Sequence, residues 1–243
     1  MQLVPVLEIR HGKCVHTEPK NSFANQVVKE DAFEVVKRWS EKGVSRLHIV
    51  DVDAIESGEP ENVDLIGKIK KAFPSIELQV LGGIKCVESA YIWADIGADF
   101  LVLNGRAIRR RNLLDDICVE FPNRVLVELD CQKGLVGTRS GEPAYELLSL
   151  ARQLEDDGVV GLVVTEIPEK GGSGGANLID IVEISRNVEM PVYANSRIEK
   201  LADLKKILES HTEKLSGLLI GKALHNGLCL SEANDLVQQY HAN

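Results

Sequence analysis

The stretch Val159–Asn177, VVGLVVTEIPEKGGSGGAN, places an apolar run, an acidic residue and a glycine-rich loop in direct succession. A near-copy lies in the first half of the chain at Ser45–Asn62, SRLHIVDVDAIESGEPEN. In both stretches an apolar run ends in an acid, a loop with glycine follows, and an asparagine precedes the next expected helix. This repetition predicts a chain built by doubling a half, with its active site where the apolar runs end.

Eight apolar runs alternate with eight stretches of helical periodicity along the chain. We expect strands at Leu3–Ile9, Leu47–Val52, Ile76–Leu81, Phe100–Leu103, Val125–Leu129, Val159–Thr165, Met190–Ala194 and Leu215–Ile220. We expect helices at Asp31–Lys42, Val63–Ala72, Val87–Ile96, Asn112–Glu120, Glu142–Asp156, Leu178–Asn187, Lys200–Glu209 and Ser231–Tyr240. Strands that are apolar throughout indicate a parallel sheet covered on both faces.

Eight strand–helix units in 243 residues predict an α/β fold of the (β/α)8 TIM-barrel class, built from two half-barrel repeats. The alternative is a doubly wound open sheet, which would more often carry a GxGxxG loop after its first strand. The corresponding loop here, Arg10–Lys13, reads RHGK. We therefore predict a single domain over residues 1–243, with half-repeats at about 1–121 and 122–243.

Matching strand ends in the two halves support this duplication, because their spacing is nearly constant at 114 to 122 residues. The matched pairs are Glu8 with Asp130, Asp51 with Glu166, Gly82 with Ser196, and Gly105 with Gly221.

The net charge of −9 argues against a nucleic-acid-binding protein, because phosphate backbones require a basic field. The arginine cluster over 106–111 fits a solvated face or a small-phosphate site better. No apolar run approaches the roughly 20 residues of a membrane helix. Five scattered cysteines without a CxxC motif are typical of reduced intracellular thiols. We expect a cytoplasmic protein that binds neither nucleic acid nor membrane.

Two carboxylates are the strongest catalytic candidates. Glu8 and Asp130 end the first and fifth strands, which face each other in an eight-stranded barrel. Two opposed carboxylates form a natural acid–base pair, because burial and mutual repulsion can separate their pKa values. The structural alternative is that each carboxylate caps loop amides or pairs with a lysine.

Glycines at strand ends predict two phosphate sites, one in each half. Backbone N–H groups can close on a phosphate where glycine ends a strand and a helix begins. The residues concerned are Gly82, Gly83, Asn104, Gly105 and Arg106 in the first half, and Ser196, Arg197, Gly221 and Lys222 in the second. The structural alternative is a set of tight turns.

The remaining candidates carry weaker signals. The loop Lys170–Ala176, KGGSGGA, could cover the site as a lid or have no role. Cys14, Cys86 and Cys131 follow strands, but no closely spaced pair supports a metal site, so we predict neither metal nor cofactor. His48 lies inside a strand, where a hydrogen-bonded core histidine is the more frequent case.

Taken as a set, the motifs LHIVDVDA, EN before a helix, QVLGGIK, LVLNGRAI, VELDCQKG, VVTEI and LLIGKAL resemble the histidine-biosynthesis barrels over essentially the whole chain. These barrels include a phosphoribosylformimino-aminoimidazole-carboxamide ribotide isomerase and the cyclase subunit of imidazole glycerol phosphate synthase. The resemblance implies a half-barrel duplication with two phosphate sites. It also implies an isomerisation that protonates a ribose ring oxygen and then removes a proton from C2.

The chain departs from that family at several site positions. Glu8 stands where the isomerases usually have aspartate, and the acid of their DRDG motif corresponds here to Lys170. Their GG at strand 7 is Ser196–Arg197. The tryptophan that these isomerases often carry after strand 5 is missing. Arg197 could replace backbone phosphate contacts with a bidentate grip.

These observations predict an isomerase or related lyase acting on a small phosphorylated metabolite, a ribotide or phosphosugar. Glu8 and Asp130 would carry the acid–base work, with Lys170 and Thr165 assisting; a lysine supplies a proton only if its pKa falls toward neutrality. One alternative is a diverged paralogue in methanopterin- or methylofuran-type one-carbon cofactor biosynthesis. Another is a non-catalytic barrel that binds a phosphorylated ligand. The sequence leaves the substrate and the oligomeric state open.

Overall fold

The computed structural model describes residues 1–16, 26–105, 107–137, 144–167, 178–210 and 212–241. The chain divides into two compact units. The N-terminal unit is Val4–Leu103, and the C-terminal unit is Asn104–Asn243 together with Met1–Leu3. Each unit is described by itself.

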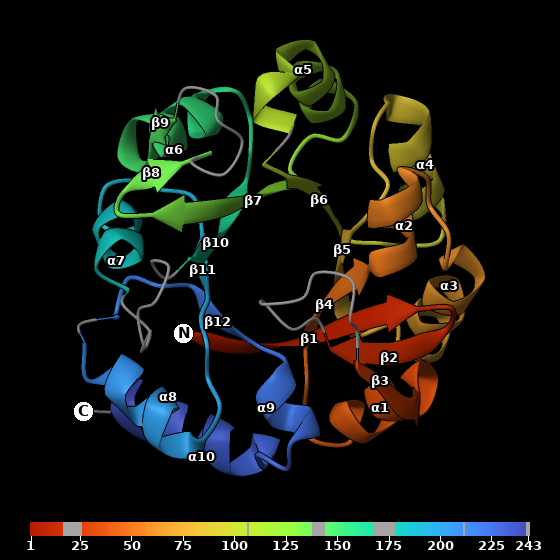
Figure 1. The fold of residues 1–243 in the computed structure, drawn as a ribbon, viewed down its shortest axis with the longest axis vertical. Coiled ribbons are helices and arrows are strands. Elements are labelled where there is room, and N and C mark those ends of the chain that lie inside the picture. Colours follow the sequence, from red (N-terminus) through yellow and green to blue (C-terminus); the bar gives the residue numbers. More distant parts are fainter. Residues whose placement is uncertain (17–25, 106, 138–143, 168–177, 211, 242–243) are drawn as a thin grey trace. The chain divides into compact units, whose positions relative to one another are not determined.

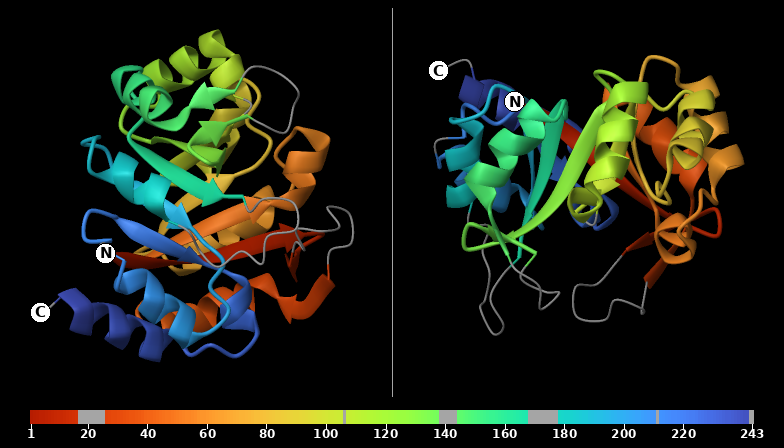
Figure 2. Two further views of the ribbon diagram at one scale, coloured as in Figure 1. Left: turned by 60° about the vertical axis from the view of Figure 1, so that its left-hand side comes forward. Right: turned by 90° about the horizontal axis from the view of Figure 1, so that it is seen from above.

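The N-terminal unit contains four parallel strands in the order β1, β4, β5 and β6. Their bounds are Gln2–Arg10, Arg46–Asp51, Glu77–Leu81 and Phe100–Asn104. An antiparallel ribbon of β2 (Lys13–His16) and β3 (Gln26–Asp31) continues from β1, as Figure 2 shows. The helices are α1 (Ala32–Ser40), α2 (Val52–Ser57), α3 (Val63–Ala72) and α4 (Val87–Asp95).

The C-terminal unit also contains four parallel strands, in the order β7, β10, β11 and β12. Their bounds are Val125–Gln132, Gly161–Glu166, Val192–Asn195 and Gly217–Ile220. Two short strands, β8 (Leu135–Val136) and β9 (Tyr145–Glu146), extend β7 in antiparallel fashion. The helical segments are η1 (Ala107–Arg109), α5 (Arg111–Glu120), α6 (Leu147–Asp156), α7 (Ile179–Ser185), α8 (Leu201–Leu208), α9 (Lys222–His225) and α10 (Leu230–His241).

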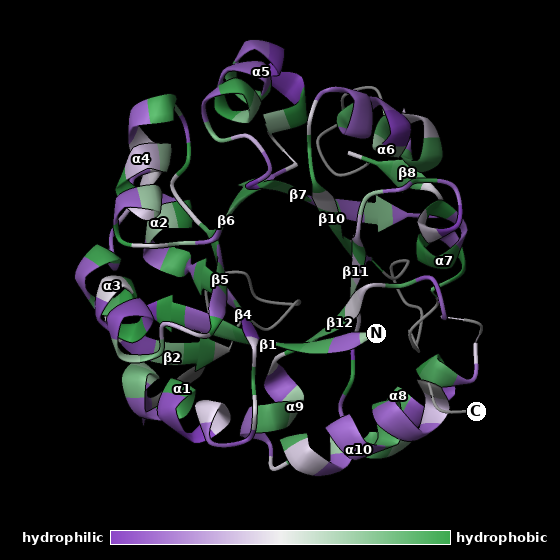
Figure 3. Cartoon of the chain, turned by 180° about the vertical axis from the view of Figure 1, so that it is seen from behind, coloured by the Kyte–Doolittle hydropathy of each residue, from purple (hydrophilic) through white to green (hydrophobic). Residues whose placement is uncertain are grey.

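Each unit buries one row of apolar side chains across its four strands. Register partners Leu7, Ile49, Val80 and Leu101 form this row in the N-terminal unit, and Leu129, Val164, Ala194 and Leu218 form it in the C-terminal unit. The helices of each unit lie on one face of its strands (Figure 1). They mix hydrophilic and hydrophobic residues (Figure 3), as expected for helices with one apolar face. Full burial of each leucine, isoleucine or valine side chain in these two rows contributes about 1.5–3 kcal/mol.

All eight predicted strand–helix repeats are present, four in each unit. The fold class is α/β, and the eight repeats of the described residues are those of a (β/α)8 TIM barrel, as predicted. The single domain with half-repeats at 1–121 and 122–243 stays a prediction. Among the described helices, none combines the length and the apolar character needed to cross a membrane.

Several predicted boundaries were wrong by one to five residues; the strand predicted at Val125–Leu129, for example, continues to Gln132. The cause is clear in two cases. The strand predicted at Leu47–Val52 ends at Asp51, because the Asp51 side chain caps α2 and draws Val52 into that helix. The helix predicted from Glu142 begins at Leu147, because Glu146 accepts hydrogen bonds from the amides of Leu148 and Ser149 and caps α6. The short elements β2, β3, β8, β9, α2, η1 and α9 were not predicted.

Candidate active site

Three polar side chains form a row across the C-terminal unit, near the carboxyl ends of adjacent strands. Asp130 in β7 is the register partner of Thr165 in β10, and Thr165 is the partner of Asn195 in β11. Parallel strands lie about 5 Å apart, and register partners share a face. Asp130 is exposed and its two neighbours are half-buried, whereas the preceding residue of each strand is fully buried. The structure therefore brings together two of the four predicted catalytic residues, Asp130 and Thr165.

The predicted phosphate residues of the second half follow two neighbouring strands. Ser196 and Arg197 come directly after β11, and Gly221 and Lys222 come directly after its partner β12. The Ser196 hydroxyl oxygen is buried and has no hydrogen-bond partner among the described residues, while the Arg197 side chain is exposed. A buried hydroxyl without a partner costs about 1–3 kcal/mol, which a ligand that accepts its hydrogen bond would recover.

Glu8 lies in the N-terminal unit, in register with Val50 on β4 and Val15 on β2. It is half-buried, whereas Leu7 and Ile9 on either side of it are fully buried on the opposite face. The Glu8 side chain thus lies on the face that the helices of this unit do not cover. Because Glu8 and Asp130 belong to different units, their pairing stays a prediction.

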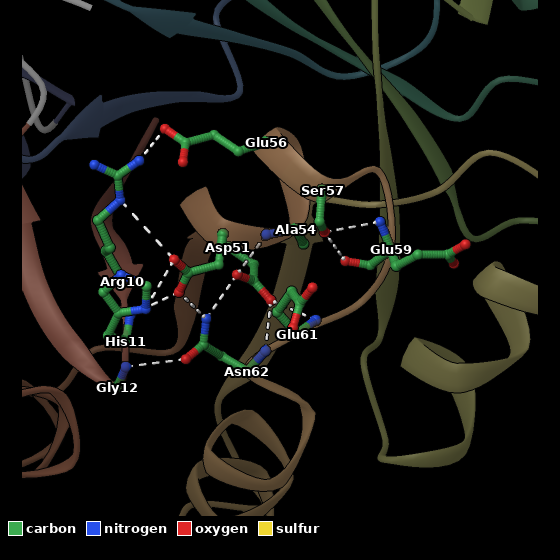
Figure 4. A network of polar contacts seen from close by, with 11 residues as sticks. Arg10, His11, Gly12, Asp51, Ala54, Glu56, Ser57, Glu59, Glu61 and Asn62 are labelled. Atoms are coloured by element: carbon green, nitrogen blue, oxygen red, sulfur yellow. Dashed lines mark hydrogen bonds and ion pairs between the residues drawn. The ribbon is translucent and has the colours of Figure 1, made fainter. Parts of the chain in front are cut away.

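Asp51, the strand-end acid matched with Glu166, has a structural role. It is fully buried, and its carboxylate accepts four hydrogen bonds (Figure 4). Oδ1 accepts from the amide of Ala54 at 3.1 Å and from Nδ2 of Asn62 at 2.7 Å, and Oδ2 accepts from the amides of Glu61 at 3.2 Å and Asn62 at 2.8 Å. Such a carboxylate organises the loop between α2 and α3.

Gly82 and Gly83 follow β5 and are pressed against the loop after β4. A Cβ atom on Gly83 would lie 2.5 Å from the carbonyl carbon of Glu59, and a Cβ on Gly82 would lie 2.8 Å from the carbonyl oxygen of Asp51. Gly83 also has a φ of +66°. Close backbone packing therefore requires glycine at these positions, and their phosphate-binding role stays a prediction.

The other predicted site residues fall elsewhere. Asn104, the exposed last residue of β6, and Gly105 belong to the C-terminal unit, so their grouping with Gly82–Gly83 in one phosphate site stays a prediction. Arg106, Lys170 and the predicted lid Lys170–Ala176 lie outside the described residues.

His48 is a buried core histidine, as predicted. It is 1% exposed, and its Nδ1 lies 3.2 Å from Oε1 of Gln79, which is also buried. Burial lowers the pKa of His48 from 6.5 to about 4, although the hydrogen bond to Gln79 partly opposes this shift. His48 is therefore a neutral imidazole at physiological pH. Its register partner on β1 is Val6, two residues before Glu8, so the side chains of His48 and Glu8 lie on the same face of the sheet.

This lowered pKa makes the stability of the fold depend on pH. Between pH 6.5 and about 4 the unfolded chain protonates His48 and the folded chain does not, so the free energy of unfolding falls as the pH falls through this window. We expect His48 to account for a loss of about 3 kcal/mol. Denaturant unfolding at pH 7 and pH 4 checks this: the loss should be smaller by that amount in His48→Asn, and equal losses in both proteins would contradict it.

The buried cysteines are held as neutral thiols. Burial raises the pKa of Cys14 to about 12 and that of Cys131 to about 11. Within the described ranges, no group of three or more His, Cys, Asp or Glu side chains is arranged to hold a metal ion.

Residues 2–229 match the sequence profile of a protein family described as "Histidine biosynthesis protein". The chain belongs to this family.

Several full-length relatives in the histidine-biosynthesis family share about a third of their residues with the chain. A protein of Thioalkalivibrio sulfidiphilus is 31% identical over 98% of this chain and 100% of its own length. A protein of Halorhodospira halophila is 33% identical over 93% of both chains, and one of Crocosphaera subtropica is 32% identical over 96% of this chain and 91% of its own. All three are named 1-(5-phosphoribosyl)-5-((5-phosphoribosylamino)methylideneamino) imidazole-4-carboxamide isomerase.

Membership in the histidine-biosynthesis family confirms the resemblance found in the sequence motifs. The isomerase names of the relatives favour the first predicted function. They do not favour a one-carbon cofactor enzyme or a non-catalytic ligand-binding barrel.

Proposed function

We propose that this chain is an isomerase acting on a ribotide with two phosphoribosyl groups, the compound in the names of its relatives. The observation that carries the proposal is the row formed by Asp130, Thr165 and Asn195. An exposed carboxylate stands there beside a hydroxyl and an amide, at the strand ends where barrel enzymes place their chemistry. The match over the full length of a relative supports the same reading.

Two carboxyl groups are sufficient for the proposed reaction. One protonates the ribose ring oxygen as the ring opens, and the other, as a carboxylate, removes the proton from C2. We assign these roles jointly to Glu8 and Asp130. Thr165 lies beside Asp130 and can donate a hydrogen bond that keeps its carboxylate in one orientation. An assisting role for Lys170 belongs to the same proposal.

Two anion sites would hold the two phosphates of such a substrate. For the second half we propose Ser196, Arg197, Gly221 and Lys222, because they follow neighbouring strands and include a buried hydroxyl with a hydrogen bond to give. For the first half we propose Gly82, Gly83, Asn104, Gly105 and Arg106. Arginine binds phosphate in bidentate fashion, so Arg197 can donate charge-assisted hydrogen bonds that a glycine in its place could not.

We also propose that the protein works in the cytoplasm. All five cysteines are free thiols, which supports a reducing compartment.

Complementation tests the proposed function in a living cell. A bacterial strain that lacks its own ribotide isomerase should grow without histidine when it expresses this chain. Asp130→Asn should abolish that growth, whereas Asp116→Asn, a change at an exposed position of α5, should preserve it. Failure of the unchanged chain to support growth, despite expression as folded protein, would count against the proposal.

A further inference from the structure

A two-residue turn joins β1, which carries Glu8, to β2. Arg10 and Lys13 are register partners across this turn, and the two residues between them, His11 and Gly12, both have positive φ values, of 48° and 72°. Two positive φ values in succession are typical of a tight hairpin whose first position favours asparagine or glycine. His11 is neither, although histidine adopts a positive φ more readily than most residues do. Contacts outside the hairpin also hold this geometry.

Those contacts come from the segment that follows β4 (Figure 4). The amide of His11 donates to Oδ2 of Asp53 at 2.6 Å, and the amide of Gly12 donates to Oδ1 of Asn62 at 3.0 Å. The Arg10 guanidinium forms an ion pair with Glu56, and its Nε lies 3.9 Å from Asp53. Arg10, the last residue of β1, and the two turn residues after it are thus attached to one neighbouring segment.

Asn62 connects the two sides of this contact. Its Nδ2 donates to Asp51 at 2.7 Å and to Asp53 at 2.9 Å, while its Oδ1 accepts the amide of Gly12. A single neutral side chain therefore bridges two carboxylates and the turn. Aspartate at this position would place a third carboxylate against the other two and remove both donors.

A second observation shows that this arrangement is not ordinary helix capping. Asn62 occupies the N-cap position of α3, where asparagine is among the most favoured residues because its side chain accepts from the first helical amides. Here the Asn62 side chain makes no capping hydrogen bond to its helix. It is committed to the turn and to the carboxylates instead.

We propose that Asn62 is a positioning residue for the isomerisation: it fixes the turn at the end of β1 and thereby the carboxylate of Glu8. The inference rests on the proposed function, in which Glu8 takes part in proton transfer. Glu8 lies two residues before Arg10 and pairs with both β2 and β4, so a displaced turn displaces the strand end that carries it. A displacement of about 1 Å can lower a catalytic rate about 100-fold.

The test compares three variants in steady-state turnover of the ribotide by the full chain. Asn62→Ala removes the bridge. Asn62→Ser also removes it, but serine can cap α3, so this variant keeps the helix start intact. The matched control is Asn187→Ala, because Asn187 is exposed and contacts the carbonyl of Glu183 and the side chain of Arg152.

We expect both Asn62 variants to lower kcat about 10- to 100-fold, with KM within about threefold of the unchanged chain. The pH profile of kcat should also move, because the surroundings of Glu8 change; a smaller amount of folded enzyme would scale the profile without moving it. The control should match the unchanged chain. A kcat for Asn62→Ser within twofold of the unchanged value, or a lowered kcat with an unmoved pH profile, would overturn the inference. If the unchanged chain turns over no ribotide, the proposed function fails and the inference fails with it.

Discussion

Replacing Asp130 with asparagine is expected to lower kcat for the ribotide about 10²- to 10⁴-fold. The substitution keeps the size and the hydrogen-bonding shape of the side chain but removes its ability to take up and release a proton, and general acid–base catalysis contributes a factor of this order. Because Asp130 is exposed, the stability of the fold should hardly change. Steady-state kinetics combined with a thermal unfolding measurement on the same preparation checks both parts.

The matched control for this prediction is Asp116→Asn on α5, which removes the same charge at an exposed position. It should leave kcat unchanged. A kcat for Asp130→Asn within about threefold of the control would remove Asp130 from the mechanism. The double variant with Glu8→Gln adds a further test: two groups that act in one reaction should show strongly non-additive losses, whereas unrelated groups should show losses that multiply.

Replacing Gly83 with alanine is expected to destabilise the fold by about 3 kcal/mol or more. The new Cβ would lie 2.5 Å from the carbonyl carbon of Glu59 and 2.7 Å from the nitrogen of Pro60, both of them backbone atoms that cannot rotate away. The positive φ of Gly83 adds the strain of a left-handed conformation. Denaturant unfolding at pH 7 measures the change.

A comparison with Gly58 separates the cost of the backbone clash from the cost of the left-handed conformation. Its φ is +79°, and a Cβ there would have nothing within 4 Å. Gly58→Ala should therefore cost only the left-handed strain, about 1–2 kcal/mol. Equal losses for the two variants would show that the packing of Gly83 against the loop does not determine its identity.

The strands and helices could be predicted because each central strand is apolar over most of its length and each long helix has one apolar face. The row Leu7, Ile49, Val80 and Leu101 is an example, since burial of all four requires helices over that face. The short elements escaped prediction for the opposite reason. The helix α2 begins at Val52, which reads as the end of an apolar run until the capping role of Asp51 is known.

The site could be predicted only in part. Topology alone directs attention to strand ends, and Asp130 beside Thr165 follows from it. Topology does not tell which strand-end acids are structural. The carboxylate of Asp51 accepts hydrogen bonds from amides ten and eleven residues further along, in a loop that folds back onto it. The sequence indicated that Asn62 precedes a helix. It gave no sign of the hydrogen bond that the Asn62 side chain accepts from the amide of Gly12, 50 residues away.

The most direct test of the proposed function is a turnover assay with the purified chain and the ribotide named for its relatives. The proposal predicts conversion to the isomerised product, at a rate that Asp130→Asn lowers by at least about 100-fold and Asp116→Asn leaves unchanged. Absence of product from folded protein at saturating ribotide would contradict it, and so would conversion that Asp130→Asn leaves intact.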